Sequence, residues 1–318
     1  MNMNVFPLVM TPAFRHGSQT PWGGHALKEL FGKDTPEDIT GESLEVSALP
    51  GLESCVSGGE YAGKTLREMH SLWGKSLTGL EGKDFPLLLK FLDTRQPLSV
   101  QVHPDDSYAL SHEGKLGKSE AWYILDAAPG AELVYGINTR GESLRSVLDA
   151  GKLESCLCRT EVHAGDVFYI PAGTVHALGA GIRCYEIQQT SDLTYRLWDW
   201  GRVGKDGRPR QLHIEQAIAV SNINSLPVRG ETVEKLPGGL RTLLVSDPHF
   251  RLYACDLGGR LSLATGKMQF LSATAKGCTL CWEDHRISLL PWQTAVLPAA
   301  LPEIAVEGRG RILVSSPA

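Results

Sequence analysis

Glycine and proline recur along this chain and divide it into short apolar segments. The 318 residues include 34 glycines and 18 prolines, and neither residue type is confined to one region. Both favour turns, because glycine accepts positive φ angles and proline fixes its own φ. Short apolar segments between turn formers are typical of strands in a sandwich or barrel. The spacing therefore predicts a mainly β chain with few helices.

The hydrophobic periodicity places the expected elements. Strands are expected at 43–47, 85–92, 98–103, 121–125 and 133–135, across 153–200 and from Leu240 to the end. Helices are expected at 64–73, where Thr65 and Glu68 have capping-box spacing, at 140–151 and at 210–221.

Turn formers between Asn222 and Gly239 indicate a linker, and 318 residues suffice for two domains. We expect a first domain at 1–235 that carries helical insertions and a smaller β domain at 236–318.

Composition excludes several classes of function. The net charge of −5 does not suggest a nucleic-acid partner. No apolar stretch approaches the length of a membrane span, and Met1 to Met10 lacks the basic start of a secretory signal. The seven cysteines form no zinc-ribbon spacing, so buried free thiols in a reducing cytoplasm are expected.

Two neighbouring segments place metal-binding side chains at short spacing. Gln101 and His103 lie two residues apart in one expected strand, so both point to the same face. Lys118 and Glu120 share a face in the same way if their segment is a strand. Because Glu120 follows His103 by 17 residues, a loop or short helix is expected between the two strands.

A third segment, from Gly165 to His176, has the spacing G-x5-P-x-G-x2-H. It predicts a tight turn, an apolar strand at 167–170 and a second turn that presents His176 at a strand start. This spacing resembles the second cupin motif, although Ala180 stands where that motif usually has Asn. The first cupin motif matches poorly, because Gln101 replaces its first His.

Gln101, His103, Glu120 and His176 together offer two nitrogen and two oxygen ligands. A set without thiolate suits a catalytic zinc that keeps a position open, whereas structural zinc more often uses Cys. A single His on a strand is more often an ordinary hydrogen-bonded residue, but the joint pattern favours a metal. We predict one Zn²⁺ per chain, with the neutral amide of Gln101 as the weaker ligand.

The order of motifs resembles the type I mannose-6-phosphate isomerases in their short bacterial form. The similarity extends over roughly 12–215. The matching stretches are Pro21 to Gly24, Gly41 to Ser47, Pro86 to Lys90, Leu98 to Asp106, Gly117 to Leu125 and Tyr185 to Trp200.

This resemblance implies a cupin-type jelly-roll β-sandwich, one zinc ion and conversion of mannose 6-phosphate to fructose 6-phosphate through an enediol. By motif position, the ligands carry over to Gln101, His103, Glu120 and His176. Residues after about 235 resemble only a second, degenerate cupin-like domain. We expect no metal there, because no His follows the strand-and-turn segment at 290–299.

A phosphorylated hexose needs cations for its dianionic phosphate and a base for proton transfer. Lys90, Lys118 and Arg196 are the candidate cations. Ser99 is a candidate hydrogen-bond donor, and Trp22 could stack on the sugar or close the pocket.

Glu186 and Lys118 are the candidate bases. Glu120 is a poor candidate, because a zinc-bound carboxylate has its lone pairs engaged. A glutamate needs a smaller pKa shift than a lysine to act near neutral pH, which favours Glu186.

Structural alternatives stand beside these roles. Lys90 could extend its charge to a sheet edge. Arg196 could pair with Asp192 or Asp199, Glu186 could pair with Arg183, and Trp22 could be an ordinary core residue.

Other functions also remain open: a metal-dependent dioxygenase of the cupin class, an isomerase of another sugar phosphate, or a sugar-phosphate sensor without catalysis. The lysines beside the ligands favour an anionic substrate over the apolar pocket of an oxygenase. The expected partner is a small hexose phosphate, with no nucleic acid or membrane, and the expected assembly is a monomer or homodimer.

Overall fold

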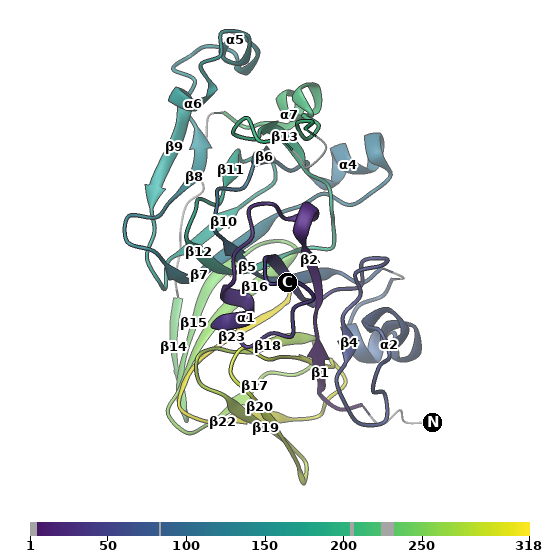
Figure 1. Ribbon diagram of the computed structural model, residues 1–318. Helices are drawn as coiled ribbons and strands as arrows, with labels where there is room; N and C mark the ends of the chain where they lie inside the picture. Colours follow the sequence, from purple (N-terminus) through teal and green to yellow (C-terminus); the bar gives the residue numbers. More distant parts are fainter. Residues whose placement is uncertain (1–4, 83, 204–206, 224–231) are drawn as a thin grey trace.

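The computed structural model describes residues 5–82, 84–203, 207–223 and 232–318 (Figure 1). Four antiparallel sheets form most of it, with a few short helices at their edges and on one outer face. The mainly β prediction is therefore confirmed.

Two sheets build the part that carries the sequence motifs. The six-stranded sheet runs in the order β10 (Val167–Ile170), β7 (Glu120–Ala127), β12 (Ile182–Gln189), β5 (Leu87–Thr94), β3 (Thr40–Val46), β2 (Ala13–His16). The five-stranded sheet runs in the order β13 (Tyr195–Trp198), β6 (Val100–Val102), β11 (His176–Ala177), β8 (Glu132–Ile137), β9 (Leu157–Glu161).

The C-terminal part consists of two further sheets. The eight-stranded sheet runs in the order β14 (Thr232–Leu236), β15 (Gly239–Ser246), β16 (Phe250–Leu257), β23 (Gly310–Pro317), β18 (Gln269–Ala273), β21 (Thr294–Leu297), β1 (Leu8–Thr11), β4 (Cys55–Val56). The four-stranded sheet runs in the order β17 (Arg260–Leu263), β22 (Ile304–Glu307), β19 (Cys278–Trp282), β20 (His285–Leu289).

The six-stranded sheet is buried on both faces. In β12, Tyr185 and Ile187 join the large core that also contains the strands of the C-terminal part. Cys184 points the other way, into a smaller core shared with the five-stranded sheet. Successive side chains alternate between faces, so Glu186 and Gln188 also point toward the five-stranded sheet. Polar groups on that face are thereby enclosed between two sheets.

Helices cover the outer face of the five-stranded sheet, where Val100, Val134 and Leu197 form a third core with helical residues. The covering helices are α5 (Leu144–Asp149), α6 (Leu153–Cys156) and α7 (Ile214–Val220). The predicted helices at 140–151 and 210–221 are thus present but shorter. The first begins after its N-cap Ser143, and the second begins after His213 rather than after Pro209.

The remaining helices are a 3₁₀ turn at Gly17–Gln19, α1 (Ala26–Glu29), α2 (Leu66–Trp73), α3 (Lys75–Thr78) and α4 (Asp106–Glu113). The predicted capping box of α2 is confirmed, with Thr65 and Glu68 bonding reciprocally. The insertion expected between His103 and Glu120 contains α4, which Asp105 caps.

The two halves share a sheet. Leu8 pairs with Val296, so β1 belongs to the eight-stranded sheet, and the chain then enters the six-stranded sheet as β2. β14 lies inside the stretch that was expected to be a linker and forms a hairpin with β15. The expected domain boundary after residue 235 falls within β14. The division into 1–235 and 236–318 stays a prediction.

Two other sequence expectations can be compared with the structure. No helix among the described residues is long and apolar enough to cross a membrane. All seven cysteines are free thiols; Cys55 and Cys158 are only partly buried, and the other five are buried.

A buried ion pair connects β3 to the C-terminal part. Lys33 Nζ lies 2.7 Å from Glu45 Oε1 and donates to the carbonyl of Trp292 at 2.6 Å. Glu45 also accepts hydrogen bonds from Ser43 and Thr294. Each charge is therefore compensated only by groups that the fold brings together.

We expect Lys33→Met to lower the free energy of unfolding by ~3 kcal/mol, because it leaves the Glu45 carboxylate buried without a counter-charge. Adding Glu45→Gln should recover part of that loss. Urea unfolding measures both effects. Lys28→Met, which removes an exposed pair with Asp38, is the matched control and should change little. Equal losses in Lys33→Met and Lys28→Met would contradict the analysis.

Candidate metal centre and active site

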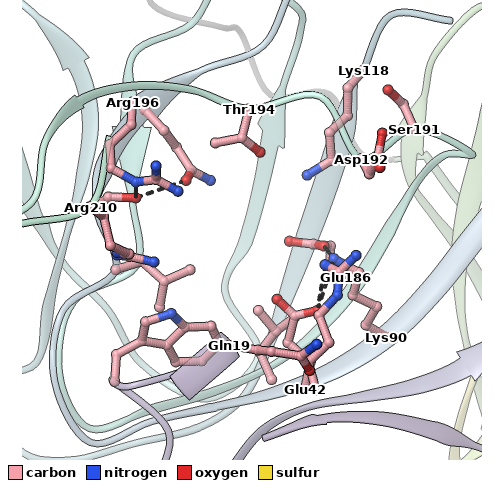
Figure 2. A pocket seen from close by; sticks show the side chains of 16 residues that line it. Gln19, Glu42, Lys90, Lys118, Glu186, Ser191, Asp192, Thr194, Arg196 and Arg210 are labelled. Atoms are coloured by element: carbon pink, nitrogen blue, oxygen red, sulfur yellow. Dashed lines mark hydrogen bonds and ion pairs between the residues drawn. The ribbon is translucent and has the colours of Figure 1, made fainter. Parts of the chain in front are cut away.

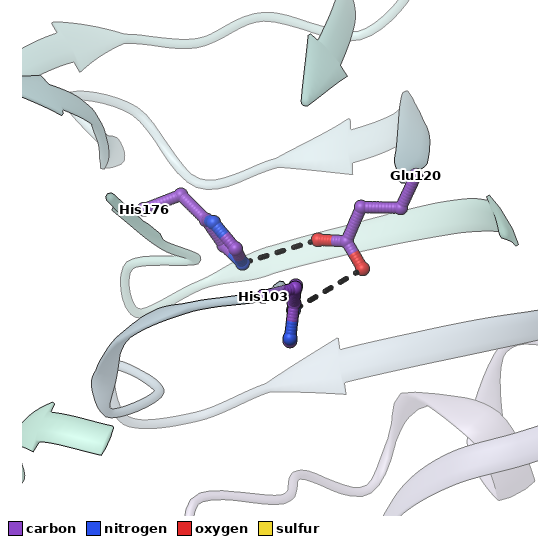
Figure 3. A group of neighbouring side chains, drawn as sticks. All are labelled: His103, Glu120 and His176. Carbon is purple, nitrogen blue, oxygen red and sulfur yellow. Dashed lines mark ion pairs between the residues drawn. The ribbon is translucent and has the colours of Figure 1, made fainter. Parts of the chain in front are cut away.

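Three strands bring His103, Glu120 and His176 together (Figure 3). One ligand atom from each residue lies within 4.8 Å of the others, and all three residues are buried. His103 directly follows β6, Glu120 begins β7 and His176 begins β11. His176 in β11 pairs with Gln101 in β6. His103 follows Gln101 by two residues and points to the same face, so the two histidines lie close together.

The turn predicted before His176 has the expected conformation. Gly165 has φ +95° ahead of β10, and Gly173 has φ +86° after it. The Gly173 N–H donates to the carbonyl of His103 at 2.8 Å. This bond connects the turn before His176 to the backbone of His103.

Backbone carbonyls orient both imidazoles. His103 Nδ1 lies 2.7 Å from the Leu193 carbonyl, and His176 Nδ1 lies 2.8 Å from the Thr174 carbonyl. A carbonyl accepts only, so each Nδ1 carries the proton and each Nε2 presents a lone pair. These Nε2 atoms lie 3.7 and 3.2 Å from the two carboxylate oxygens of Glu120.

Electrostatics keep His103 and Glu120 in the metal-binding form. Burial and the nearby Lys118 charge lower the pKa of His103 well below its ordinary value. Burial alone would raise the pKa of Glu120, but Lys118 and the two histidines hold that pKa well below its usual range. The Glu120 side chain is fully buried, with the Lys118 ammonium and the two imidazoles around its oxygens. Converging imidazole lone pairs around an ionised carboxylate fit a divalent cation.

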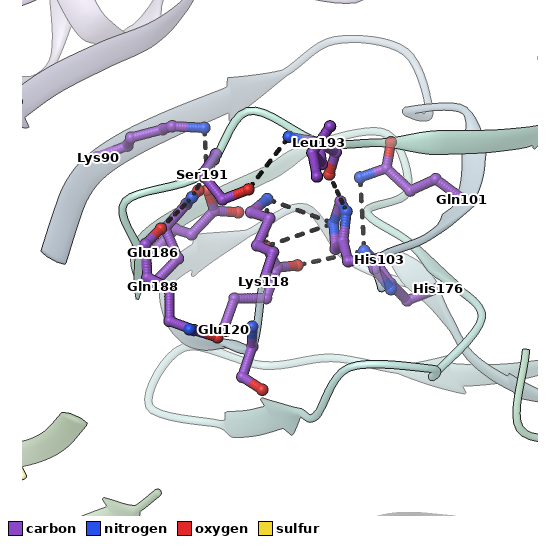
Figure 4. Close-up of polar contacts among 12 residues, drawn as sticks. Lys90, Gln101, His103, Lys118, Glu120, His176, Glu186, Gln188, Ser191 and Leu193 are labelled. Carbon is purple, nitrogen blue, oxygen red and sulfur yellow. Dashed lines mark hydrogen bonds and ion pairs between the residues drawn. The ribbon is translucent and has the colours of Figure 1, made fainter. Parts of the chain in front are cut away.

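Gln101 and Lys118 complete the surroundings of this group (Figure 4). The Gln101 amide nitrogen lies 3.4 Å from His176 Nε2, and its oxygen accepts from Ser99 at 3.2 Å. The amide would have to flip to offer oxygen to a metal, so its role as fourth ligand stays a prediction. Lys118 Nζ lies 2.6 Å from Glu120 Oε2 and 3.3 Å from His103 Nε2.

A cavity of about 330 Å³ opens beside the metal group (Figure 2). Its size is at the low end for small-molecule sites. Seven residues that the sequence singled out line it: Trp22, Lys90, Ser99, Gln101, Lys118, Glu186 and Arg196. The structure therefore brings all the predicted site residues to one place, at this cavity or at the metal group that Gln101 and Lys118 contact.

Lys90 lies between two carboxylates. Its Nζ is 3.2 Å from Glu186 and 3.4 Å from Glu42 Oε2, and Arg15 pairs with the same Glu42 oxygen at 3.3 Å. Burial alone would lower the pKa of Lys90, but the two carboxylates raise it above its ordinary value. Lys90 is buried, so the alternative of a lysine that reaches solvent at a sheet edge is wrong.

Glu186 presents one oxygen without a hydrogen bond. Its Oε2 accepts from Trp122 Nε1 at 2.8 Å, whereas Oε1 makes no well-aligned hydrogen bond with a described residue and has the Lys90 ammonium 3.2 Å away. The alternative pair with Arg183 is wrong, because Arg183 pairs with Asp126 and Glu186 pairs with Lys90.

Arg196 has no carboxylate within ion-pair distance among the described residues, so both structural pairs considered for it are wrong. Asp199 pairs with Arg202 and Arg210, and Asp192 pairs with Lys115. Arg196 Nε instead donates to Ser99 Oγ at 3.2 Å. Trp22 packs in the core between the sheets and also lines the cavity, so its contact with the sugar stays a prediction.

Sequence reasoning missed several cavity-lining residues, namely Arg15, Gln19, Glu42, Ser191, Asp192, Thr194 and Arg210. Glu42 had the best signal, because it lies in the stretch 41–47 on which the family resemblance rests, and that strand is buried throughout. Arg210 lies outside every strand and helix, in the segment before α7.

The C-terminal part offers no comparable group. Across the described ranges, His103, Glu120 and His176 form the one cluster of three His, Cys, Asp or Glu side chains with this geometry. The strand and turn expected at 290–299 are present, as β21 and a turn at Trp292 with φ +64°.

Comparisons with known proteins identify the relatives of this chain. The sequence model of the type I phosphomannose isomerase catalytic domain matches residues 14–129. The chain is 40% identical to the mannose-6-phosphate isomerase ManA of Bacillus subtilis over 98% of its length and 99% of that protein's. It is 43% identical to a mannose-6-phosphate isomerase of Streptococcus mutans over 76% of its length and 77% of that protein's. A crystal structure of the mannose 6-phosphate isomerase from Bacillus subtilis superposes with a TM-score of 0.91 at 36% identity, covering 97% of this chain and 99% of that one.

We expect the purified protein to bind one divalent metal ion per chain and His176→Ala to lose most of it, because a buried imidazole ligand is removed. Gln101→Ala should keep a large part, because an amide is a weaker donor. Elemental analysis after dialysis measures the metal. The matched control is His163→Ala, which removes an exposed imidazole. A His176→Ala variant with the wild-type metal content would refute the site.

Proposed function

Since the chain belongs to the type I phosphomannose isomerase family, we propose that it interconverts mannose 6-phosphate and fructose 6-phosphate with one bound zinc ion. One observation carries the proposal above the others. A buried group of three side chains that could hold a metal ion adjoins a cavity lined by lysine, arginine and the carboxylate of Glu186. Such a site combines an electrophile, a base and cations for an anionic substrate.

His103, Glu120 and His176 would hold the metal, with Gln101 as a further, weaker ligand. When bound, zinc supplies an electrophile that polarises the sugar oxygens at C1 and C2. The ligand set is one that suits zinc, because it mixes imidazole and carboxylate and contains no thiolate.

Glu186 is the proposed base. Isomerisation of the open-chain aldose requires removal of the C2 proton, formation of an enediol and delivery of a proton to C1. Oε1 of Glu186, which makes no well-aligned hydrogen bond with a described residue, can take the proton from C2 and return it to C1, while Trp122 donates to Oε2. Lys90 supplies a counter-charge to the carboxylate at 3.2 Å.

Lys118 is proposed to act on oxygen rather than on carbon. Its ammonium lies against Glu120 and His103, at the boundary between the metal group and the cavity. An ammonium there can donate a hydrogen bond to the substrate oxygen whose charge increases in the enediol. Metabolism of a phosphorylated sugar also accords with the cytoplasmic location expected from the sequence.

Removing the metal should abolish turnover of mannose 6-phosphate, and adding zinc back should restore it. An assay coupled to the appearance of fructose 6-phosphate measures both, before and after dialysis against a chelator. Wild-type activity in the fully chelated protein would contradict the metal requirement. Tight binding of mannose 6-phosphate without any turnover would instead indicate a sugar-phosphate sensor.

Glu186→Gln should retain zinc and bind sugar phosphate normally, yet nearly stop exchange of the substrate C2 proton with solvent deuterium, because shape is kept and basicity is lost. NMR follows the exchange. Asp126→Asn, a surface change in β7, is the matched control. If Glu186→Gln exchanges the proton at the wild-type rate and Lys118→Met does not, the two roles must be reversed.

A further inference from the structure

The backbone next to Glu120 is joined to the turn that presents His176. Ser119 directly precedes Glu120 and is buried. Its hydroxyl accepts a hydrogen bond from the Ala172 N–H, in the turn before His176, at 3.2 Å. The position of Ser119 therefore bears on two of the three metal-binding side chains.

Gln189, the last residue of β12, holds Ser119 with both its backbone and its side chain. The Gln189 N–H donates to the Ser119 carbonyl at 3.2 Å, and Oε1 accepts from the Ser119 N–H at 2.9 Å. The other end of the same amide, Nε2, donates to Asp106 Oδ1 at 3.0 Å. A backbone N–H only donates and a carboxylate oxygen accepts, so these two partners fix the orientation of the amide.

Asp106 belongs to the segment that follows His103. It is the first residue of α4, and its Oδ1 also accepts from the Gly117 N–H at 2.8 Å. The two segments are in close contact, because a Cβ added at Gly117 would lie 2.3 Å from the carbonyl carbon of Asp105. The segment 104–106 after His103 and the segment 117–119 before Glu120 thus lie against each other, and the one amide bonds to both.

The chain beyond Gln189 reaches His103 by a second route (Figure 4). Ser191 Oγ donates to the Leu116 carbonyl at 2.8 Å and accepts from the Leu193 N–H at 3.3 Å. The Leu193 carbonyl in turn orients His103 through Nδ1, at 2.7 Å. A displacement at the end of β12 would therefore be transmitted to His103 as well as to Glu120.

The contacts of Gln189 are with protein groups rather than with the cavity proposed for the substrate. Its side chain is 4% exposed and is not among those that line that cavity. Both ends of the amide are engaged, one by Ser119 and the other by Asp106. Any effect of this residue on the site must therefore act through the residues that it holds.

We propose that Gln189 is a positioning residue of the metal centre, whose buried amide fixes Ser119 against Asp106 and so sets the separation of Glu120 and His103. The proposal rests on the metal group of the proposed function. A glutamine suits the task because one amide both accepts from a backbone N–H and donates to a carboxylate. Loss of a group that orients metal ligands typically lowers metal affinity about 10- to 100-fold.

Metal binding by Gln189→Met tests the assignment, because methionine keeps the length of the side chain and makes neither hydrogen bond. We expect the Kd for zinc, measured by competition with a chromogenic chelator, to rise about 10- to 100-fold. The visible spectrum of the cobalt-loaded variant should also differ from that of the wild type. The d-electron levels of Co²⁺ depend on the arrangement of its ligands, whereas Zn²⁺ has a filled d shell. Gln189→Asn, which is one methylene shorter and can keep one of the two bonds, should lie between.

Two control variants separate positioning from general stability. Gln293→Met removes an amide that accepts from the Leu290 N–H in the C-terminal part and should leave the zinc Kd unchanged. Lys33→Met, expected to destabilise the fold away from the site, should also leave it unchanged. An equal rise of the Kd in Lys33→Met would attribute the effect to stability and overturn the inference. Circular dichroism establishes that each variant is folded, and if Gln189→Met is not, Gln189→Asn decides by the same measurements.

These measurements need no substrate, so they separate this inference from the proposed function. A weakened zinc Kd together with an altered cobalt spectrum supports the inference even where mannose 6-phosphate is not turned over. A wild-type zinc Kd or a wild-type cobalt spectrum in Gln189→Met overturns it, even where the wild type is an active isomerase. Absence of zinc and cobalt binding by the wild type overturns both.

Discussion

The six-stranded sheet is covered on both faces, and this constraint governs the rest of the structure. A charged side chain on such a sheet is removed from water, so the fold must supply its counter-charge at close range. On β5 and β12, Lys90 and Glu186 face each other at 3.2 Å, and Glu42 of β3 adds a second carboxylate. On β3, Glu45 faces the other way and is neutralised by Lys33. The one sheet therefore connects the catalytic cavity and the contact with the C-terminal part.

Where the protein leaves charge or lone pairs uncompensated, a ligand is expected. The imidazole nitrogens of His103 and His176 that face the buried Glu120 carboxylate present lone pairs, so a cation would complete that group. Arg196 has no carboxylate partner among the described residues, so an anion would complete its surroundings. Between the two groups Ser99 bonds both Arg196 and Gln101. Under the proposed function, a cation would bind at one end of the cavity and the anionic part of the substrate near Arg196 at the other, and this polarity matches a sugar with a carbonyl at one end and a phosphate at the other.

Local patterns predicted the parts of the site that depend on local geometry. The alternation at 98–103 correctly placed Ser99, Gln101 and His103 on one face, and the turn residues around 165–173 correctly predicted that His176 starts a strand. Thr65 and Glu68 predicted the start of α2 closely, because a capping box is a contact between residues near each other in the chain. Helices α5 and α7 are shorter than predicted. Only the part of each predicted segment that contacts the five-stranded sheet packs its apolar side chains into the third core.

By itself, the sequence determined the mainly β architecture, the candidate ligands His103, Glu120 and His176, and the charged residues placed in apolar strands. Each of these follows from interactions within a few residues, whose spacing is visible in one dimension. The tertiary structure decided which charges neutralise one another: Lys90 with Glu42 and Glu186, and Asp199 with Arg202 and Arg210 rather than with Arg196. It also decided that β1 completes a sheet whose other main strands follow it by more than two hundred residues. These outcomes depend on the order of strands in the sheets and on the path of the loops, because counter-charges and hydrogen-bond partners come from neighbours in space that no local spacing identifies.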